Sequence, residues 1–222
     1  MIRPEFIPYK HPCSFSEAEM KNRAEEFRDD LRARRTVRSY SERAIPEGVI
    51  EYCLEAALTA PSGANQQPWH FVVIRDPVIK KKIRTAAEAE ERAFYSGRAP
   101  DEWLEALRSL GTDEHKPFLE TAPVLIAVFA KNYEIRDSGQ RRKNYYVQES
   151  VGISTGILIT ALHRCGLSML THTPSPMGFL NEILDRPVNE RAYLLLVVGY
   201  ASDDAVVPEI EKKKLSDVAS FF

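Results

Sequence analysis

The sequence has no hydrophobic run long enough to cross a bilayer. Its longest apolar stretches, at 124–130 and 193–198, are much shorter than the about 20 residues that a transmembrane helix needs. The first ten residues contain no apolar run of signal-peptide length. We therefore expect a soluble protein of the cytoplasm, with no membrane partner.

The sequence also has little net charge and few cysteines. The net charge of -2 gives no basic surface for nucleic acid or anionic lipid, so neither is expected as a partner. Cys13, Cys53 and Cys165 have spacings that match no metal motif, and we expect buried, reduced thiols. No histidine has a second ligand at a useful spacing, so we expect no metal site. The absence of G-x-G-x-x-G after a strand argues against a Rossmann unit.

What is present is an alternation of amphipathic and apolar segments in a chain of 222 residues, 44% of them hydrophobic. Apolar periodicity and turn residues predict helices and strands along the whole chain. The expected helices are 16–35, 46–57, 77–95, 101–110, 148–162 and 178–184, and the expected strands are 69–74, 124–130, 168–171 and 194–198. This order predicts an α+β fold with one central sheet covered by helices.

Two of the expected helices differ in character. The helix at 16–35 is rich in charge and is expected to lie on a surface as an arm. The helix at 148–162 has small or apolar residues on nearly every face, which predicts burial on all sides, at the centre of the domain or of a dimer.

Three short clusters have the composition of a ligand site. Arg34, Arg35, Thr36 and Arg38 place three guanidinium groups and a hydroxyl where they can bind a phosphate. The alternative is that these arginines only complement the dipole of a helix that ends here.

The other two clusters lie in turns. In the segment 60–65, Gly63 allows the backbone to approach a ligand closely, although a plain tight turn is also compatible with this composition. Thr171, His172 and Thr173 offer two hydroxyls and an imidazole where a strand ends.

These three clusters occur together, in this order, in the flavin nitroreductase superfamily, which the segment RRTVRSYSERAIPEGVI resembles. The similarity to the iodotyrosine deiodinase branch extends from Arg34 to Leu215. It includes TAPSGANQQPWHFVVIRDP, the ETAP before the second strand, RKNYYVQESVGISTGILITAL and THTP. The resemblance implies FMN as cofactor, a central mixed sheet flanked by helices, and a domain-swapped homodimer with shared active sites. It also implies one domain over 1–222, with an N-terminal arm (1–33), an active-site lid (88–118) and a C-terminal extension (207–222).

The resemblance also implies roles for individual residues at the cofactor. The residues that match its cofactor-binding segments are Arg34, Arg35, Thr36, Arg38, Pro61, Ser62, Gly63, Thr171, His172, Thr173 and Lys212. Among them Thr173 matches the catalytic threonine whose hydroxyl meets flavin N5, and the segment 61–63 matches one that reaches the flavin from the partner subunit. Lys212 stands where the family often has arginine, so the charge is kept but the planar fork is lost.

A second set of residues matches the substrate lid of the deiodinases. Glu91 and Tyr95 are spaced i and i+4, so they share one face of a helix, and Lys116 follows. A carboxylate, a phenol and an ammonium are complementary to an amino-acid zwitterion, and the resemblance implies that they bind it. It also implies that the backbone N–H of Ala64 holds the phenolate. The pattern alone is more typical of a solvated helix and a surface lysine.

The function that the resemblance implies is reductive removal of halide from iodotyrosine or another halotyrosine. Reduced FMN would supply the electrons in single steps, tyrosine would be the product, and NAD(P)H or a reductase would be the electron donor. The main alternative is a generalist NAD(P)H-dependent nitroreductase or quinone reductase. A non-catalytic flavin- or amino-acid-binding protein is the alternative from another class.

Overall fold

The computed structural model describes residues 5–10 and 14–222 and divides the chain into two units, Met1–Arg34 and Arg35–Phe222. The first unit contains helix α1 (Glu17–Ala33), which confirms the helix expected here. A capping box starts it: the N–H of Glu19 donates to the Ser16 hydroxyl at 3.3 Å, and the Glu19 carboxylate accepts from the Ser16 N–H at 2.9 Å. No residue of α1 is buried, as its charged composition predicts.

The second unit is built on a four-stranded sheet in the order β1-β2-β6-β5. Its strands are β1 (Trp69–Ile74), β2 (Val124–Lys131), β5 (Ser168–His172) and β6 (Glu190–Gly199). All three strand pairs of this sheet are antiparallel. Within residues 5–10 and 14–222, the parallel pairing expected of a mixed sheet is limited to the isolated bridge between Thr36 and Met169. The α+β class is confirmed.

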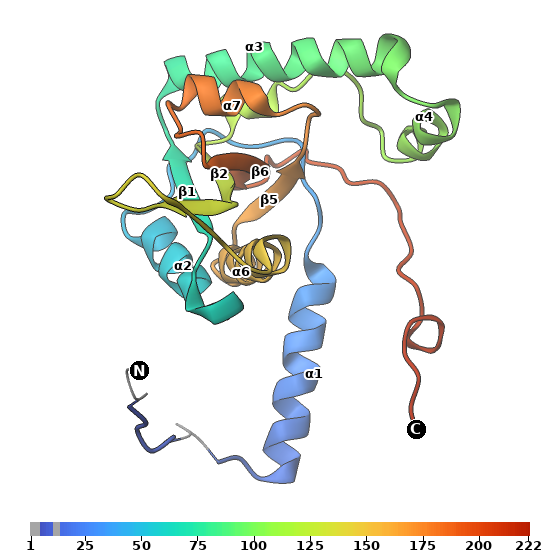
Figure 1. Cartoon of the computed structure of the whole chain (residues 1–222). Helices are drawn as coiled ribbons and strands as arrows, with labels where there is room; N and C mark the ends of the chain where they lie inside the picture. Colours follow the sequence, from blue (N-terminus) through green and yellow to red (C-terminus); the bar gives the residue numbers. More distant parts are fainter. Residues whose placement is uncertain (1–4, 11–13) are drawn as a thin grey trace. The chain divides into compact units, whose positions relative to one another are not determined.

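Helices cover both faces of this sheet (Figure 1). On one face lie α2 (Val49–Leu58) and α6 (Val147–Arg164), and on the other lie α3 (Pro77–Ala93) and α7 (Gly178–Ile183). Alternate residues of the central strands face opposite sides: Ile126 belongs to the apolar cluster under α2 and α6, and Leu125 to the cluster under α3 and α7. Burial of strand β2 on both faces explains why it consists almost entirely of apolar residues.

The segment between α3 and β2 contains several shorter elements. Helix α3 continues into a π-helical turn (Phe94–Arg98), followed by α4 (Asp101–Arg108) and α5 (Phe118–Thr121). Elsewhere, 3-10 turns occur at Gly63–Asn65 and Leu215–Asp217. Among the described residues no helix has the length and apolar character needed to span a membrane.

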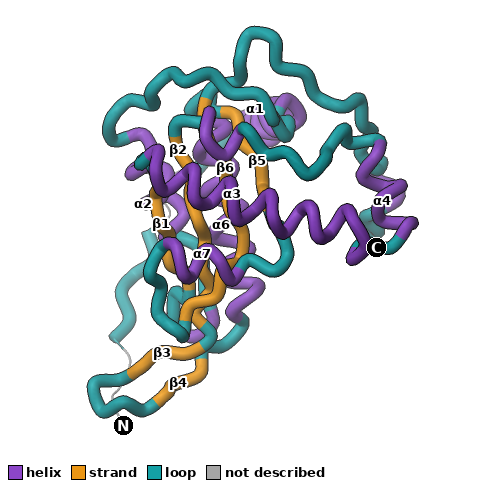
Figure 2. The backbone as a smooth tube through the Cα atoms, turned by 90° about the horizontal axis from the view of Figure 1, so that it is seen from above, coloured by secondary structure: helices purple, strands orange, loops and turns teal. Residues whose placement is uncertain are grey.

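Two expectations about element boundaries are wrong. Pro46 does not open the second helix, because Gly48 takes a left-handed conformation (φ 81°) as the N-cap and α2 begins at Val49. Between β2 and α6, where no strand is expected, the chain forms a hairpin, β3 (Tyr133–Ile135) and β4 (Arg141–Lys143), which projects from the sheet (Figure 2).

The expectation that the helix at 148–162 is buried on all sides is wrong for the single chain. Helix α6 buries six residues against the sheet and α2: Ser150, Val151, Ser154, Thr155, Leu158 and Leu162. Its opposite side is open, since Ile153 is 46% exposed and Gly156 is exposed as well. One chain has a sheet on only one side of this helix, so small and apolar residues are left at the surface.

Candidate functional site

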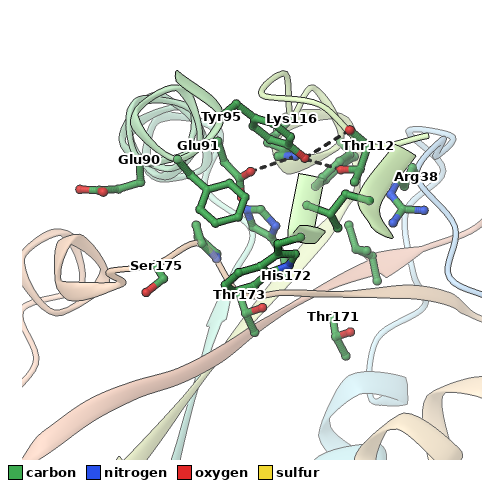
Figure 3. A pocket seen from close by; sticks show the side chains of 16 residues that line it. Arg38, Glu90, Glu91, Tyr95, Thr112, Lys116, Thr171, His172, Thr173 and Ser175 are labelled. Atoms are coloured by element: carbon green, nitrogen blue, oxygen red, sulfur yellow. Dashed lines mark hydrogen bonds and ion pairs between the residues drawn. The ribbon is translucent and has the colours of Figure 1, made fainter. Parts of the chain in front are cut away.

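A cavity of about 220 Å³ lies between the segment 88–118 and the end of strand β5. We call it the pocket and the segment 88–118 the lid segment. Figure 3 shows Glu91, Tyr95 and Lys116 on one side of the pocket and Thr171 and Thr173 on the other. The lining residues are Arg38, Glu90, Glu91, Phe94, Tyr95, Trp103, Leu107, Thr112, Lys116, Phe118, Leu170, Thr171, His172, Thr173, Pro174 and Ser175.

The three residues predicted to bind an amino-acid zwitterion meet in this pocket. Lys116 Nζ lies 3.4 Å from Glu91 Oε2 and 3.2 Å from Thr112 Oγ1, and it also donates to the carbonyl of Asp113. The Lys116 side chain is only 4% exposed and that of Glu91 14%. Burial raises the pKa of Glu91, and the nearby Lys116 ammonium opposes that rise. The two charges therefore neutralise each other inside the pocket.

Tyr95 adds a phenol to the same side of the pocket. Its hydroxyl donates to the Thr112 carbonyl at 3.2 Å, and its ring lies 5.8 Å from the Lys116 ammonium. Burial is the main cause that raises the pKa of Tyr95. The phenol therefore stays protonated at neutral pH and can donate a hydrogen bond.

Sequence reasoning missed the apolar wall of the pocket. Phe94 and Trp103 pack edge to face with ring centroids 5.1 Å apart, and Leu107 lines the pocket beside them. A signal for this wall was present, because Trp103 and Leu107 are spaced i and i+4 on α4 and so share one helix face. Such a wall suits a ligand with an aromatic ring.

The opposite side of the pocket is formed by the end of β5 and the residues that follow it. Thr171 and Thr173 are exposed, and His172 between them is buried, because successive side chains of a strand point to opposite faces. The His172 ring packs edge to face on Phe118 at 5.8 Å, and its Nε2 has no hydrogen-bond partner in the described part of the chain. Burial lowers the pKa of His172 to about 3, assisted by the positive charges of Lys116 and Arg38, so the imidazole is neutral.

Of the predicted phosphate-binding cluster, Arg38 is the member that lines the pocket. Thr36 forms the parallel bridge with Met169, and the Arg35 guanidinium donates to the carbonyl of Pro208. Arg34 is the C-cap of α1 in the first unit. Lys212 is exposed in the segment after β6 and does not line the pocket.

The predicted flavin-binding turn at 61–64 does not line the pocket of its own chain. Its conformation is defined by contacts near the start of α6. The Gly63 N–H donates to Ser150 Oγ at 3.4 Å, Ser62 Oγ accepts from the Gln67 N–H at 2.9 Å, and Ala64 takes a positive φ of 50°. Pro61 and Ala64 of this turn are exposed.

Gly63 cannot be replaced without moving its neighbours. A Cβ at this position would lie 2.7 Å from the Tyr145 carbonyl oxygen. We expect Gly63→Ala to lower the free energy of unfolding by about 1–3 kcal/mol, as overpacking usually does, and to displace the turn. Urea denaturation measures the change, and Gly178→Ala is the matched control because its Cβ would meet nothing within 4 Å. Equal stability of the two variants would contradict this reading of the turn.

No group of His, Cys, Asp or Glu that could hold a metal occurs in the part of the chain that the structure describes.

Comparison with known proteins identifies the family. The Nitroreductase family model matches residues 31–200. The chain is 56% identical over 211 residues to an iodotyrosine deiodinase of Haliscomenobacter hydrossis, with 95% of each chain covered. It belongs to the nitroreductase family and, within it, to the iodotyrosine deiodinases. Human iodotyrosine deiodinase 1 is 40% identical, over 96% of this chain and 74% of that protein.

Solved structures agree with this family membership. A crystal structure of oxidized iodotyrosine deiodinase bound to FMN and 3-iodo-L-tyrosine matches with a TM-score of 0.74 at 30% identity. The match covers 88% of this chain and 100% of that one. A BluB-like flavoprotein of Clostridium difficile matches with a TM-score of 0.67 at 20% identity, which supports the fold alone. The nitroreductase-like fold is thus confirmed.

Proposed function

We propose that this chain is an FMN-dependent oxidoreductase that removes halide from iodotyrosine or another halotyrosine and yields tyrosine. The observation that carries the proposal is the convergence of Glu91, Tyr95 and Lys116 in one pocket, in a chain of the deiodinase family. In the reaction a carbon–halogen bond is replaced by a carbon–hydrogen bond, which consumes two electrons and one proton and releases halide.

The lid segment selects the zwitterion of the substrate. Glu91 accepts hydrogen bonds from the substrate ammonium, Lys116 donates to its carboxylate, and Tyr95 adds a further hydrogen bond. Glu91 and Lys116 are paired with each other at 3.4 Å. A zwitterion replaces this one ion pair by two, so both buried charges keep a partner, which buried charges require. The aromatic ring of the substrate packs near Trp103 and Phe94.

The residues of the pocket fit a flavin. Thr171 and Thr173 present two exposed hydroxyls, Arg38 presents a guanidinium, and His172 Nε2 is a buried polar atom without a partner. When it is bound and reduced, FMN supplies the electrons in single steps. The hydroxyl of Thr173 would donate to or accept from flavin N5, and Thr171 and His172 would bind beside it. The residues that would hold the phosphate are Arg34, Arg35, Thr36, Arg38 and Lys212, which offer four cationic side chains and one hydroxyl.

A homodimer completes the site. The cavity of about 220 Å³ is smaller than the about 300–1,000 Å³ of typical ligand pockets, which supports a contribution from a second chain. The second chain would supply the turn Pro61–Gly63, which would contact the flavin, and the Ala64 N–H, which would donate to the phenolate of the substrate. The exposed side of α6, around Ile153 and Gly156, and the arm containing α1 pack against the partner in a domain-swapped arrangement. NAD(P)H or a reductase of the cytoplasm supplies electrons to this dimer.

The first experiment is an anaerobic titration of the dithionite-reduced protein with 3-iodotyrosine, with flavin absorbance and tyrosine followed together. Stoichiometric reoxidation of the flavin with release of tyrosine and iodide is the expected result. If the flavin stays reduced with iodotyrosine but is reoxidised by a nitroaromatic compound, the protein is a generalist nitroreductase instead. Tight ligand binding without any turnover would mean a binding protein.

A further inference from the structure

Two cysteines that are far apart in the sequence meet between helices α2 and α6. The Sγ atoms of Cys53 and Cys165 lie 3.8 Å apart, although 112 positions separate the two residues. Cys53 is buried in α2, as expected, but the expectation of burial is wrong for Cys165, which is exposed as the C-cap of α6. Both are free thiols. Formation of a disulfide requires the sulfur atoms to approach to about 2.05 Å, which rotation of the exposed Cys165 side chain can provide.

We propose that Cys53 and Cys165 form a redox-modification site, which a hydroperoxide oxidises to an intrachain disulfide that links α2 to α6. In the first step the Cys165 thiolate attacks a peroxide oxygen, the O–O bond breaks, and the alcohol or water leaves, so Cys165 becomes a sulfenic acid. In the second step the Cys53 sulfur attacks the sulfenic sulfur, the S–O bond breaks, and water leaves with the Cys53 proton. Overall the two thiols lose two electrons, and the hydroperoxide gains them.

The different burial of the two thiols sets the order of these steps. Cys165 is exposed, so an oxidant in solution can reach it. Cys53 is buried, and burial raises its pKa to about 12, which keeps it a thiol that does not react with solution oxidants on its own. Once Cys165 is oxidised, Cys53 is already in contact with it, so the second step is intramolecular and fast relative to further oxidation.

The disulfide would act on the elements that support the 61–64 turn. Helix α2 runs directly into this segment, and Ser154 of α6 donates to the Ala57 carbonyl of α2 at 2.8 Å. Ser150 of α6 accepts from the Gly63 N–H. A covalent link between α2 and α6 therefore holds together the two helices that fix this turn, and it closes a long loop that constrains the unfolded chain.

The test uses the full-length, FMN-loaded protein with Cys13→Ser, which removes the third thiol of the sequence. Hydrogen peroxide is the probe, and thiol titration, intact mass and melting temperature are the readouts. We expect both remaining thiols to be lost, the mass to fall by two hydrogen atoms, and Tm to rise by about 5 °C or more. Dithiothreitol is expected to reverse all three changes.

Additional replacement of Cys165 by serine is the matched control, and it should abolish the mass loss and the rise in Tm. Because Cys53 is buried, Cys53→Ala tests the same link with less disturbance of packing than a polar replacement. Three outcomes would overturn the proposal: a gain of two or three oxygen atoms on Cys165 without loss of hydrogen, a disulfide only between chains, or an oxidised form without a higher Tm.

Discussion

Glu91→Gln is expected to weaken halotyrosine binding by about 1.5–3 kcal/mol, the contribution of a hydrogen bond to a charged group. This corresponds to about a 10- to 150-fold higher Kd. The carboxylate is 14% exposed and already faces a cation, the Lys116 ammonium at 3.4 Å. The amide of glutamine keeps the shape of the side chain but can no longer neutralise the substrate ammonium. Titration of the oxidised flavoprotein with 3-iodotyrosine measures the change in Kd.

The neighbouring residue offers a matched control. Glu90 also lines the pocket, but its carboxylate pairs with Arg98 at 2.8 Å, and both side chains are more exposed. Exposed ion pairs contribute little, so Glu90→Gln should change the free energy of binding by less than about 1 kcal/mol.

A second control changes the ligand instead of the protein. The analogue of iodotyrosine without its amino group has no ammonium for Glu91 to bind. Glu91→Gln should therefore leave the Kd of this analogue unchanged or lower it. In the wild type the buried Glu91 carboxylate has no partner in this ligand, and the variant removes that charge. An equal loss for both ligands would show that Glu91 only supports the lid segment and does not contact the substrate.

Much of the fold could be predicted from the sequence because the core segments have clear periodicity. The expected strand at 69–74 coincides with β1, and the helix at 178–184 with α7 to within one residue. The hairpin β3–β4 could not be predicted in this way. Its strands have three residues each and are largely polar and exposed, so neither burial nor length distinguishes them from a loop.

The candidate site was predictable where local spacing fixes the geometry. Glu91 and Tyr95 lie on one face of a helical segment and both line the pocket, as their i and i+4 spacing indicates. The burial of Lys116 could not be predicted, because the residue follows a charged segment. Besides its local hydrogen bonds to Thr112 and Asp113, its ammonium contacts Glu91, which is distant in the sequence. The role expected of the 61–64 turn depends on a second chain, and that role stays a prediction.

The structure also predicts that acid destabilises the protein through His172. Its pKa is about 3 in the folded chain, well below the ordinary value of 6.5. The folded state therefore keeps His172 neutral while the unfolded state binds a proton below about pH 6.5. Stability that is fully present above pH 6.5 is lost as the pH falls from 6.5 towards 3. A shift of this size corresponds to a loss on the order of 4–5 kcal/mol at the acid end.

The measurement is a set of urea denaturation curves between pH 7.5 and about pH 4.5, at one protein concentration and one FMN concentration. In this window the difference in unfolding free energy between the wild type and His172→Leu should shift in favour of the variant by about 1.4 kcal/mol per pH unit below pH 6.5. Taking the difference removes the contribution of the carboxylates that both proteins share. His115→Leu controls for the loss of an exposed histidine.

Parallel stability curves for the wild type and His172→Leu would show that a protonated His172 is accommodated in the folded pocket. The charges around the imidazole argue against that outcome. Lys116 and Arg38 both disfavour a further positive charge, and the nearby carboxylate, Glu91, is already paired with Lys116. A proton on His172 would thus add an unpaired cation to a buried site. The residue is accordingly suited to remain neutral beside a bound ligand throughout the neutral pH range.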